Sequence, residues 1–246
     1  MANTRGLEVA PRWRPATVVS KDGRNDARPT GWAAVRARTY RGLNAGLAAL
    51  LLVLLSPIML VIALLIRMTS RGPVIYRQRR VGLDRRGGRV PAENHQREVD
   101  YGGRLFDIYK FRTMHNGADD VGQVWATPAD PRITHVGRIL RLYRLDELPQ
   151  LFNVVKGDMN IVGPRPEQPE IALVLRAEID GYYDRHRVPP GITGWAQINL
   201  HYDRNIEDVR RKVALDLEYI ERQSVAEDVS ILLRTVPVVL FKRGAC

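Results

Sequence analysis

The sequence predicts a small mixed α/β domain with amphipathic helices and one membrane helix near its N-terminus. Three observations support this fold class. An uncharged apolar segment follows an arginine-rich region, two short β-rich segments come next, and helical spacing of apolar residues dominates the remainder. The 246 residues, 45% of them apolar, are enough for one core. We divide the chain into a tail (1–35), a membrane segment (36–71) and a main domain (72–246).

The charge composition indicates an anionic partner. The net charge is +11 and the isoelectric point is near 10.2, with arginine outnumbering lysine. Nucleic acid, an acidic membrane surface and substrate phosphates all fit this balance. The single cysteine, Cys246, excludes an intramolecular disulfide, and the five histidines lack the spacing of a zinc site.

The N-terminal third begins with a polar tail and continues into an apolar segment. Residues 1–35 lack apolar periodicity and a signal-peptide core, so they predict a disordered basic tail. Residues 43–66 then carry no charge over 24 positions, enough to cross a bilayer. Ser56 and Pro57 interrupt this segment and predict two short apolar halves, 43–55 and 58–66.

Both flanks of the apolar segment are basic. Because lysine and arginine mark the cytoplasmic side of a membrane segment, two basic flanks favour a helix that enters and returns to the same face. Proline is also tolerated in spanning helices, so the residues alone leave a re-entrant and a kinked spanning helix open. The flanking residues are Arg36, Arg38, Arg41, Arg67, Arg71, Arg77, Arg79 and Arg80.

The main domain shows two strand signals followed by three helix signals. Residues 74–82 and 105–114 have the β-branched and aromatic content of strands, separated by a polar loop at 84–104. Apolar spacing predicts helices over 137–156 and 206–222. The apolar stretch 229–244 fits either a core helix or an interfacial helix lying on the membrane.

An acidic pair, Asp146 and Glu147, is the sharpest local feature. One interpretation is structural: Asp146 caps a helix, Glu147 complements its dipole, and Pro149 is tolerated in the first turn. The other is chemical, because arginines surround the pair at Arg138, Arg141, Arg144 and Arg165. Arginine binds phosphate, one carboxylate can attack phosphorus, and its neighbour can hold Mg²⁺ against a diphosphate.

Several longer motifs resemble the bacterial sugar transferase family, the monotopic phosphoglycosyl transferases that prime exopolysaccharide and glycoconjugate synthesis. The resemblance covers about residues 38–244 and lies in several motifs in the family's order. These are the Ser56-Pro57 segment, GPVIYRQRRVG (72–82), FDIYKFRTM (106–114), LDELPQLFNVVKGDMNIVGPRPE (145–167), PGITGWAQIN (190–199) and the basic amphipathic end.

The resemblance implies a reaction and a location. Asp146 would be the nucleophile that attacks the β-phosphorus of a UDP-sugar and releases UMP, and Glu147 would help to hold Mg²⁺. The phospho-sugar would then pass to polyprenyl phosphate, typically undecaprenyl phosphate. The helix broken at Ser56-Pro57 would re-enter the cytoplasmic leaflet of the bacterial inner membrane, which makes 72–246 the catalytic domain. A homo-oligomer is compatible with the sequence.

Further site residues carry alternative interpretations. Arg141 and Arg165 match basic positions of the family and would bind phosphate. Lys110 and Arg112 would either do the same or lie on a solvated strand face. Trp195 would either line the nucleotide or lipid-head region or pack in a tight turn.

The sequence departs from the family's usual pattern in its 84–104 loop, at Pro189 and at 200–205. It also looks like a minimal form, without the N-terminal bundle of many relatives. Two other functions stay open: a scaffold of polysaccharide assembly without catalysis, and a membrane-tethered nucleic-acid-binding protein. The second lacks zinc spacing, a helix-turn-helix signal and stacking aromatics, so we expect no nucleic-acid partner.

Overall fold

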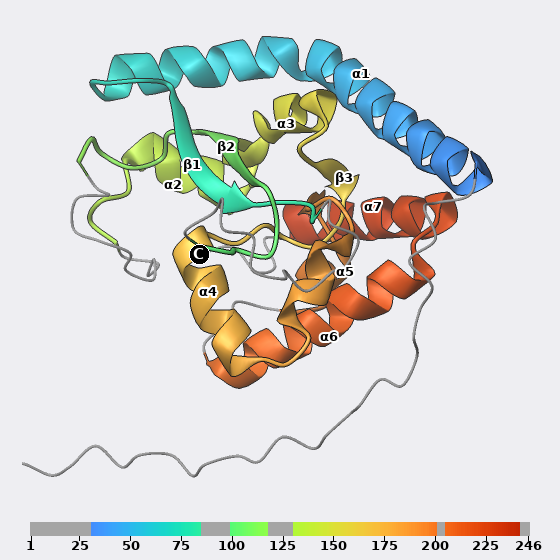
Figure 1. Ribbon diagram of the computed structural model, residues 1–246. Coiled ribbons are helices and arrows are strands. Elements are labelled where there is room, and N and C mark those ends of the chain that lie inside the picture. The colour runs from blue at the N-terminus through green and yellow to red at the C-terminus, as the bar shows by residue number, and fades with distance from the viewer. Residues whose placement is uncertain (1–30, 85–98, 118–129, 201–204, 242–246) are drawn as a thin grey trace, which may run out of the picture.

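The computed structural model describes residues 31–84, 99–117, 130–200 and 205–241. A long helix, α1 (Gly31–Thr69), lies along one side of a compact domain of shorter helices and short strands (Figure 1). Most of the predicted tail, most of the 84–104 loop and residues 201–204 fall outside the described ranges.

Helix α1 runs through Ser56 and Pro57 without interruption, so the prediction of two separate apolar halves is wrong. The helix bends near its middle in Figure 1. Proline lacks the N–H that would reach the carbonyl four residues earlier, here that of Val53. The Ser56 hydroxyl donates to this carbonyl instead, at 2.8 Å. The serine therefore replaces the donor that proline removes, and the helix bends without ending.

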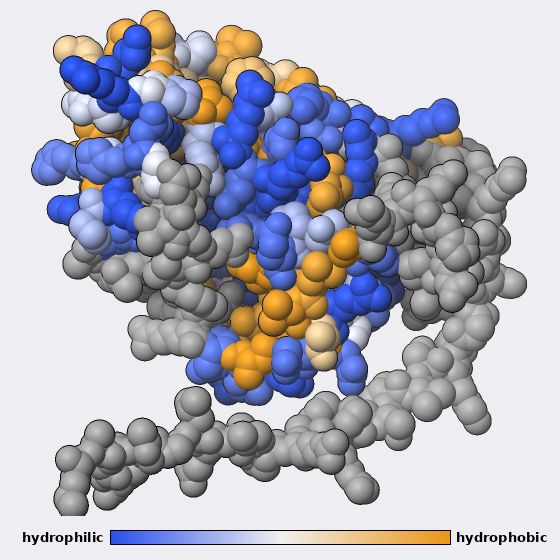
Figure 2. Space-filling view, turned by 60° about the vertical axis from the view of Figure 1, so that its left-hand side comes forward, coloured by the Kyte–Doolittle hydropathy of each residue, from blue (hydrophilic) through white to orange (hydrophobic). Residues whose placement is uncertain are grey.

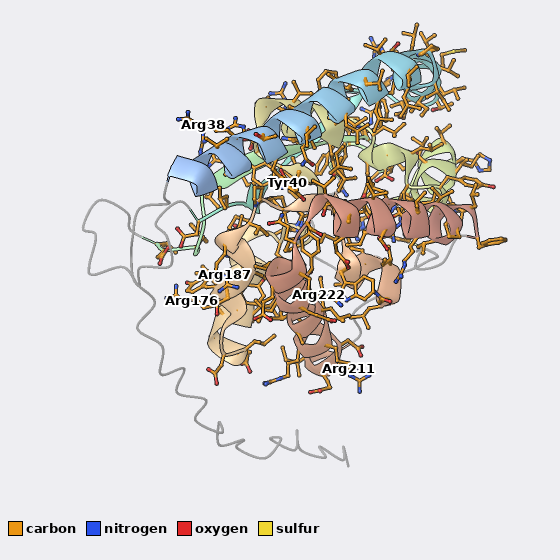
Figure 3. All side chains as sticks on the ribbon, turned by 90° about the vertical axis from the view of Figure 1, so that its right-hand side faces the viewer. Arg38, Tyr40, Arg176, Arg187, Arg211 and Arg222 are labelled. Atoms are coloured by element: carbon orange, nitrogen blue, oxygen red, sulfur yellow. The ribbon has the colours of Figure 1, made fainter. Side chains whose placement is uncertain are left out.

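Both ends of α1 are bonded to the same domain. Near its start, Asn44 Oδ1 accepts from the Ile161 amide at 2.9 Å, and the Tyr40 hydroxyl donates to Asp228. Just beyond its last residue, the Ser70 carbonyl accepts from Arg112 Nη2 at 2.8 Å. Figure 3 shows Tyr40 close to the helix that carries Asp228. A straight helix that left the domain would lose one of these two attachments.

Most of the exposed surface of α1 between its flanking arginines is apolar. In the described chain, one helix segment, Ala37–Thr69, is long and apolar enough to cross a membrane. Figure 2 shows hydrophobic residues gathered along the top of one face, where α1 lies, above a largely hydrophilic middle. The exposed large apolar residues of α1 are Val35, Leu43, Leu47, Leu50, Val53, Leu54, Ile58, Leu60, Val61, Leu64, Leu65 and Met68.

Two small sheets form the β part of the fold. Strands β1 (Ile75–Val81) and β2 (Leu105–Phe111) pair antiparallel, with Ile75 opposite Phe111, which confirms both strand predictions. Strands β3 (Asn160–Val162) and β4 (Gly191–Thr193) pair in parallel. With the surrounding helices, they confirm a mixed α/β domain.

The prediction of a single helix over 137–156 is wrong. The structure has α2 (His135–Leu142), a 3-10 turn η1 (Leu145–Glu147) and α3 (Gln150–Lys156). Arg144 adopts a left-handed conformation with φ of 54°, which ends α2 and turns the chain. Pro149 then lacks the N–H that a continuous helix requires. Each piece still buries apolar residues: Leu140 and Leu145 lie in one hydrophobic cluster, and Leu151 and Val154 of α3 lie in another.

The C-terminal half supplies the helices under α1. They are α4 (Pro169–Glu178), the 3-10 helix η2 (Tyr182–Arg187), α5 (Trp195–Asn199), α6 (Ile206–Arg222) and α7 (Val225–Leu240). The predicted helix 206–222 is confirmed at both bounds.

Helix α7 starts before the predicted 229–244 segment and is amphipathic. It buries Ile231 and Asp228 on its inner side. Its opposite side carries apolar residues that are 50–69% exposed, as an interfacial helix would: Val225, Val229, Leu233, Val236 and Leu240.

Candidate active site

The acidic pair lies on η1, between α2 and α3. Arg144, in its left-handed conformation, directs the chain so that Asp146 and Glu147 both point inward, with 9% and 7% of their surfaces exposed. A non-glycine residue in the left-handed region costs about 1–3 kcal/mol of backbone strain, and the surrounding packing must offset this cost. Asp146 makes no cap hydrogen bond and lies inside η1, so the helix-cap interpretation is wrong.

Glu147 is held by two cations from distant parts of the chain. Lys110, on β2, donates to Glu147 Oε1 at 3.0 Å. Arg165, in the segment after β3, donates to the same oxygen at 2.7 Å and to Oε2 at 3.4 Å. Burial alone would raise the pKa of Glu147, but Arg165 and Lys110 together hold it well below its usual range. Glu147 therefore stays ionised.

Asp146 has the opposite electrostatic environment. Burial raises its pKa above the usual range of an aspartate, with Lys110 opposing and the neighbouring Glu147 charge adding to the rise. No hydrogen bond to its carboxylate is present among the described residues. The two acids thus have pKa values pushed apart, a pattern that separates their chemical roles.

Arg141 extends the positive charge around Asp146. It lies in the last turn of α2, and its charge lowers the pKa of both Asp146 and Asp130. Its Nη1 atom is buried and has no hydrogen-bond partner in the described chain. A buried, unpaired guanidinium N–H beside a carboxylate can receive an anionic oxygen.

Two of the predicted site residues are bonded elsewhere. Arg112, 6% exposed, donates to the Ser70 carbonyl and hydroxyl and so holds the end of α1. Trp195 donates to Glu218 Oε2 at 3.1 Å and packs under the guanidinium groups of Arg222 and Arg234.

Lys110 and Arg112 were each expected either to bind phosphate or to lie on a solvated strand face. The Lys110 side chain is 17% exposed, so neither residue lies on a solvated strand face. The structure therefore brings Lys110, Arg141 and Arg165 to the acid pair, while Arg112 and Trp195 bind other groups.

Comparison with known proteins agrees with this arrangement of motifs. A family profile described as "Bacterial sugar transferase" matches residues 35–242. The chain belongs to the bacterial sugar transferase family. This match includes α1 from residue 35 onward, the acid pair and α7 in one continuous stretch.

Several known sugar transferases are similar over most of this chain. The chain is 40% identical over 205 residues to the Aeromonas hydrophila UDP-N-acetylgalactosamine-undecaprenyl-phosphate N-acetylgalactosaminephosphotransferase, covering 83% of this chain and 44% of the relative. It is 43% identical over 192 residues to the Escherichia coli UDP-glucose:undecaprenyl-phosphate glucose-1-phosphate transferase, covering 77% and 38%. A Caulobacter vibrioides protein of the same name is 40% identical over 207 residues, covering 83% and 71%. The chain thus spans less than half the length of the first two relatives.

The structure also shows residues near the acid pair that sequence reasoning missed. Arg80 on β1 donates to the Pro166 carbonyl at 3.1 Å and lies 3.9 Å from Glu167. Arg185 on η2 donates to the Arg165 carbonyl at 2.9 Å. Both lie far from the acid pair in sequence, so no local spacing connects them to it. The GPRPE motif itself was the one available signal, because two prolines around an arginine predict a fixed backbone.

The donors of the acid pair fit a magnesium ion in chemical type. Mg²⁺ prefers oxygen ligands and is usually held by one or two carboxylates together with substrate phosphates and water. Asp146 and Glu147 supply two adjacent carboxylates of this kind. Among the described residues, no group of three or more His, Cys, Asp or Glu side chains gathers as a dedicated metal cage. A metal here would need oxygens from the substrate.

Proposed function

We propose that the protein transfers a sugar-1-phosphate from a UDP-sugar to polyprenyl phosphate through a covalent intermediate on Asp146. The observation that carries this proposal is the pair of neighbouring acids with opposite environments. Glu147 is neutralised by Lys110 and Arg165, whereas the Asp146 carboxylate is buried beside them with no hydrogen-bond partner in the described part of the chain. A carboxylate with little hydrogen bonding and little solvation is a better nucleophile than one in water.

The reaction has two displacements at the same phosphorus atom. In the first, an Asp146 oxygen attacks the β-phosphorus of the UDP-sugar, and the bond to the bridging oxygen breaks, so UMP leaves. In the second, a phosphate oxygen of polyprenyl phosphate attacks this phosphorus and breaks its bond to Asp146. The products are polyprenyl diphospho-sugar and the free carboxylate. Arg141 and Arg165 would offset the negative charge that builds up on the phosphoryl oxygens.

Mg²⁺ is part of this proposal. Glu147, with Asp146 beside it, would hold the ion, and the ion would supply Lewis-acid stabilisation to the diphosphate. Lys110 is positioned to keep Glu147 ionised whether or not the ion is bound, because it contacts Oε1 directly.

The membrane placement follows from the apolar surfaces. We infer that α1 is re-entrant: it dips into the cytoplasmic leaflet of the inner membrane and returns, with Ser56 and Pro57 near the deepest point. The attachments of both its ends to one domain support this. The exposed apolar side of α7 would lie in the same interface, next to the polyprenyl phosphate headgroup.

An assay of UMP release tests the proposed reaction. Purified protein in a membrane mimetic would receive undecaprenyl phosphate, Mg²⁺ and a panel that includes UDP-glucose and UDP-N-acetylgalactosamine, the sugars in the names of its relatives. We expect UMP from one donor, and none when excess EDTA removes the metal. Full activity in EDTA would contradict the role of Mg²⁺. No UMP from any donor, with folded protein, would favour the non-catalytic scaffold.

Topology mapping tests the re-entrant helix. Cys246 would be replaced by serine, and single cysteines would be introduced at Arg38 and at Arg71. In closed vesicles with the cytoplasmic face outward, we expect an impermeant maleimide to label both positions equally. Labelling of one position alone would show a helix that spans the bilayer.

A further inference from the structure

We propose that Arg185, held in place by Asp216, is a positioning residue that fixes Arg165 against Glu147. This inference rests on the proposed function, because it assigns a task to the acid pair. It concerns residues that lie behind the site and touch no reacting atom.

The backbone segment that carries Arg165 is fixed at every carbonyl. Four consecutive carbonyl oxygens, from Pro164 to Glu167, each accept a hydrogen bond from a donor elsewhere in the fold. The pairs are Pro164 with the Gly191 amide (2.9 Å), Arg165 with Arg185 Nη2 (2.9 Å), Pro166 with Arg80 Nη1 (3.1 Å) and Glu167 with the Val81 amide (2.9 Å). We call residues 164–167, with these bonds, the clamped segment.

The sequence of the clamped segment suits this arrangement. Pro164 and Pro166 have a fixed φ and no N–H, so the segment has few backbone donors that need partners. A proline also restricts the residue before it to extended conformations, which here applies to Arg165. Gly191 is required beside the segment, because a Cβ atom there would lie 2.0 Å from the Gly163 amide nitrogen. The segment is therefore a rigid base for the Arg165 side chain.

The Arg185 side chain reaches the clamped segment at Arg165 itself, where Nη2 donates to the backbone carbonyl. Its side chain is 1% exposed, and a buried charge of this kind needs a charged partner. Asp216, on α6, accepts from Nη2 at 2.6 Å, and the Tyr182 hydroxyl accepts from Nη1 at 3.0 Å. These contacts leave the guanidinium little freedom. Because the same Nη2 also bonds the Arg165 carbonyl, the buried pair fixes the backbone at that residue.

The chain of contacts from α6 to the acid pair is short. It runs from Asp216 to Arg185, then to the Arg165 carbonyl, and from the Arg165 guanidinium to Glu147 at 2.7 Å. The Arg165 side chain is 30% exposed and long, so its own packing fixes it only in part. A displacement of about 1 Å at a reacting group can lower a rate about 100-fold. Loss of Asp216 would therefore weaken catalysis through Arg165.

A double-mutant cycle tests this inference. Asp216→Asn keeps the shape of the side chain and removes its charge. We expect it to lower kcat for UMP release by about 10- to 100-fold in the otherwise native protein. In an Arg165→Ala background, the same substitution should change kcat by less than about threefold, because coupled residues are not additive. An equal loss in both backgrounds would overturn the inference, since a general structural effect does not depend on Arg165.

A matched control separates positioning from loss of stability. Asp228→Asn changes another buried carboxylate, 8% exposed, that bonds Tyr40 and Tyr219 but no atom of the clamped segment. We expect kcat per folded molecule to stay within about twofold of the native value. If Asp216→Asn does not fold, Arg185→Lys is the second variant, because it keeps the charge beside Asp216 and loses the fork that bridges to Arg165.

Hydrogen exchange gives a readout that does not depend on activity. The amides of Gly191 and Val81 donate to the Pro164 and Glu167 carbonyls, so they should exchange faster in Asp216→Asn than in the native protein. Their exchange should be unchanged in Asp228→Asn. If the native protein released no UMP, the proposed function would fail, but this exchange result would still decide whether Asp216 and Arg185 hold the segment. Unchanged exchange in Asp216→Asn would overturn the inference.

Discussion

Replacing Asp146 with asparagine is expected to abolish phospho-sugar transfer while leaving the fold and the membrane association intact. The amide keeps the shape of the carboxylate but cannot attack phosphorus, so kcat should fall by at least about 1,000-fold. Burial raises the pKa of Asp146, which means that its negative charge opposes folding at neutral pH. We therefore expect the free energy of unfolding of the variant to be unchanged or slightly higher.

Three measurements check this expectation. UMP release reports the reaction, mass spectrometry of the intact protein after mixing with donor reports the aspartyl phospho-sugar, and thermal unfolding reports stability. Asp180→Asn is the matched control, because Asp180 is exposed at the end of α4 and should behave as the native protein does. Native turnover in Asp146→Asn would remove Asp146 from the role of nucleophile.

Replacing Glu147 with glutamine is expected to damage both activity and stability. Lys110 and Arg165 would then lie near each other, largely buried, without the anion that balances them. Removing one member of a buried ion pair costs about 3 kcal/mol or more, and Arg165, which is partly exposed, places this case at the low end. Transfer should fall by at least about 100-fold, because the carboxylate is also needed for the metal and for the position of Arg165.

The pH dependence of unfolding distinguishes this role from a general packing effect. The pKa of Glu147 in the folded protein lies below its usual value, so its stabilisation is present above about pH 4.3, its value in the unfolded chain. The stability difference between native protein and Glu147→Gln should be constant near neutral pH and shrink as the pH falls below that value. Glu221→Gln, at an exposed position of α6, is the control. A difference that does not vary with pH would show a packing defect instead.

The two substitutions therefore have opposite expected effects on stability at adjacent positions. This contrast was not visible in the sequence, where Asp146 and Glu147 are simply two neighbouring acids. Their different environments come from Lys110, which is 37 positions before Glu147, and from Arg165, which is 18 positions after it. Contacts over such separations depend on how β2 and the segment after β3 pack around η1.

Sequence patterns predicted those helices and strands whose ends are set by residues within or next to the same segment. Helix α6 has its predicted bounds because Asn205 caps its start and Val209 and Val213 follow the helical period. The break within 137–156 was missed, although Pro149 offered one signal. The other cause, the left-handed conformation of Arg144, has no signature in an arginine and is imposed by the packing around it.

The structure brings together predicted site residues that lie in one contiguous motif, whereas contacts that depend on packing had no signal in the sequence. The acid pair and Arg165 lie in one stretch of sequence, and the structure places them together. Arg112 resembles Lys110 in type and position, yet it turns to Ser70 because the end of α1 packs there. The Arg185–Asp216 pair joins η2 to α6 across 31 positions, and nothing in either segment indicates the other.

The hydrogen bond from Ser56 to the Val53 carbonyl has a consequence for how the protein responds to bilayers of different thickness. A spanning helix adapts to thicker or thinner membranes by tilting, and its energy changes with the hydrophobic mismatch. A bent helix whose two ends are bonded to one domain has a depth set by the protein, and its bend exposes no unpaired Val53 carbonyl to lipid. In the proposed re-entrant placement, activity should therefore vary little between lipids of short and long acyl chain.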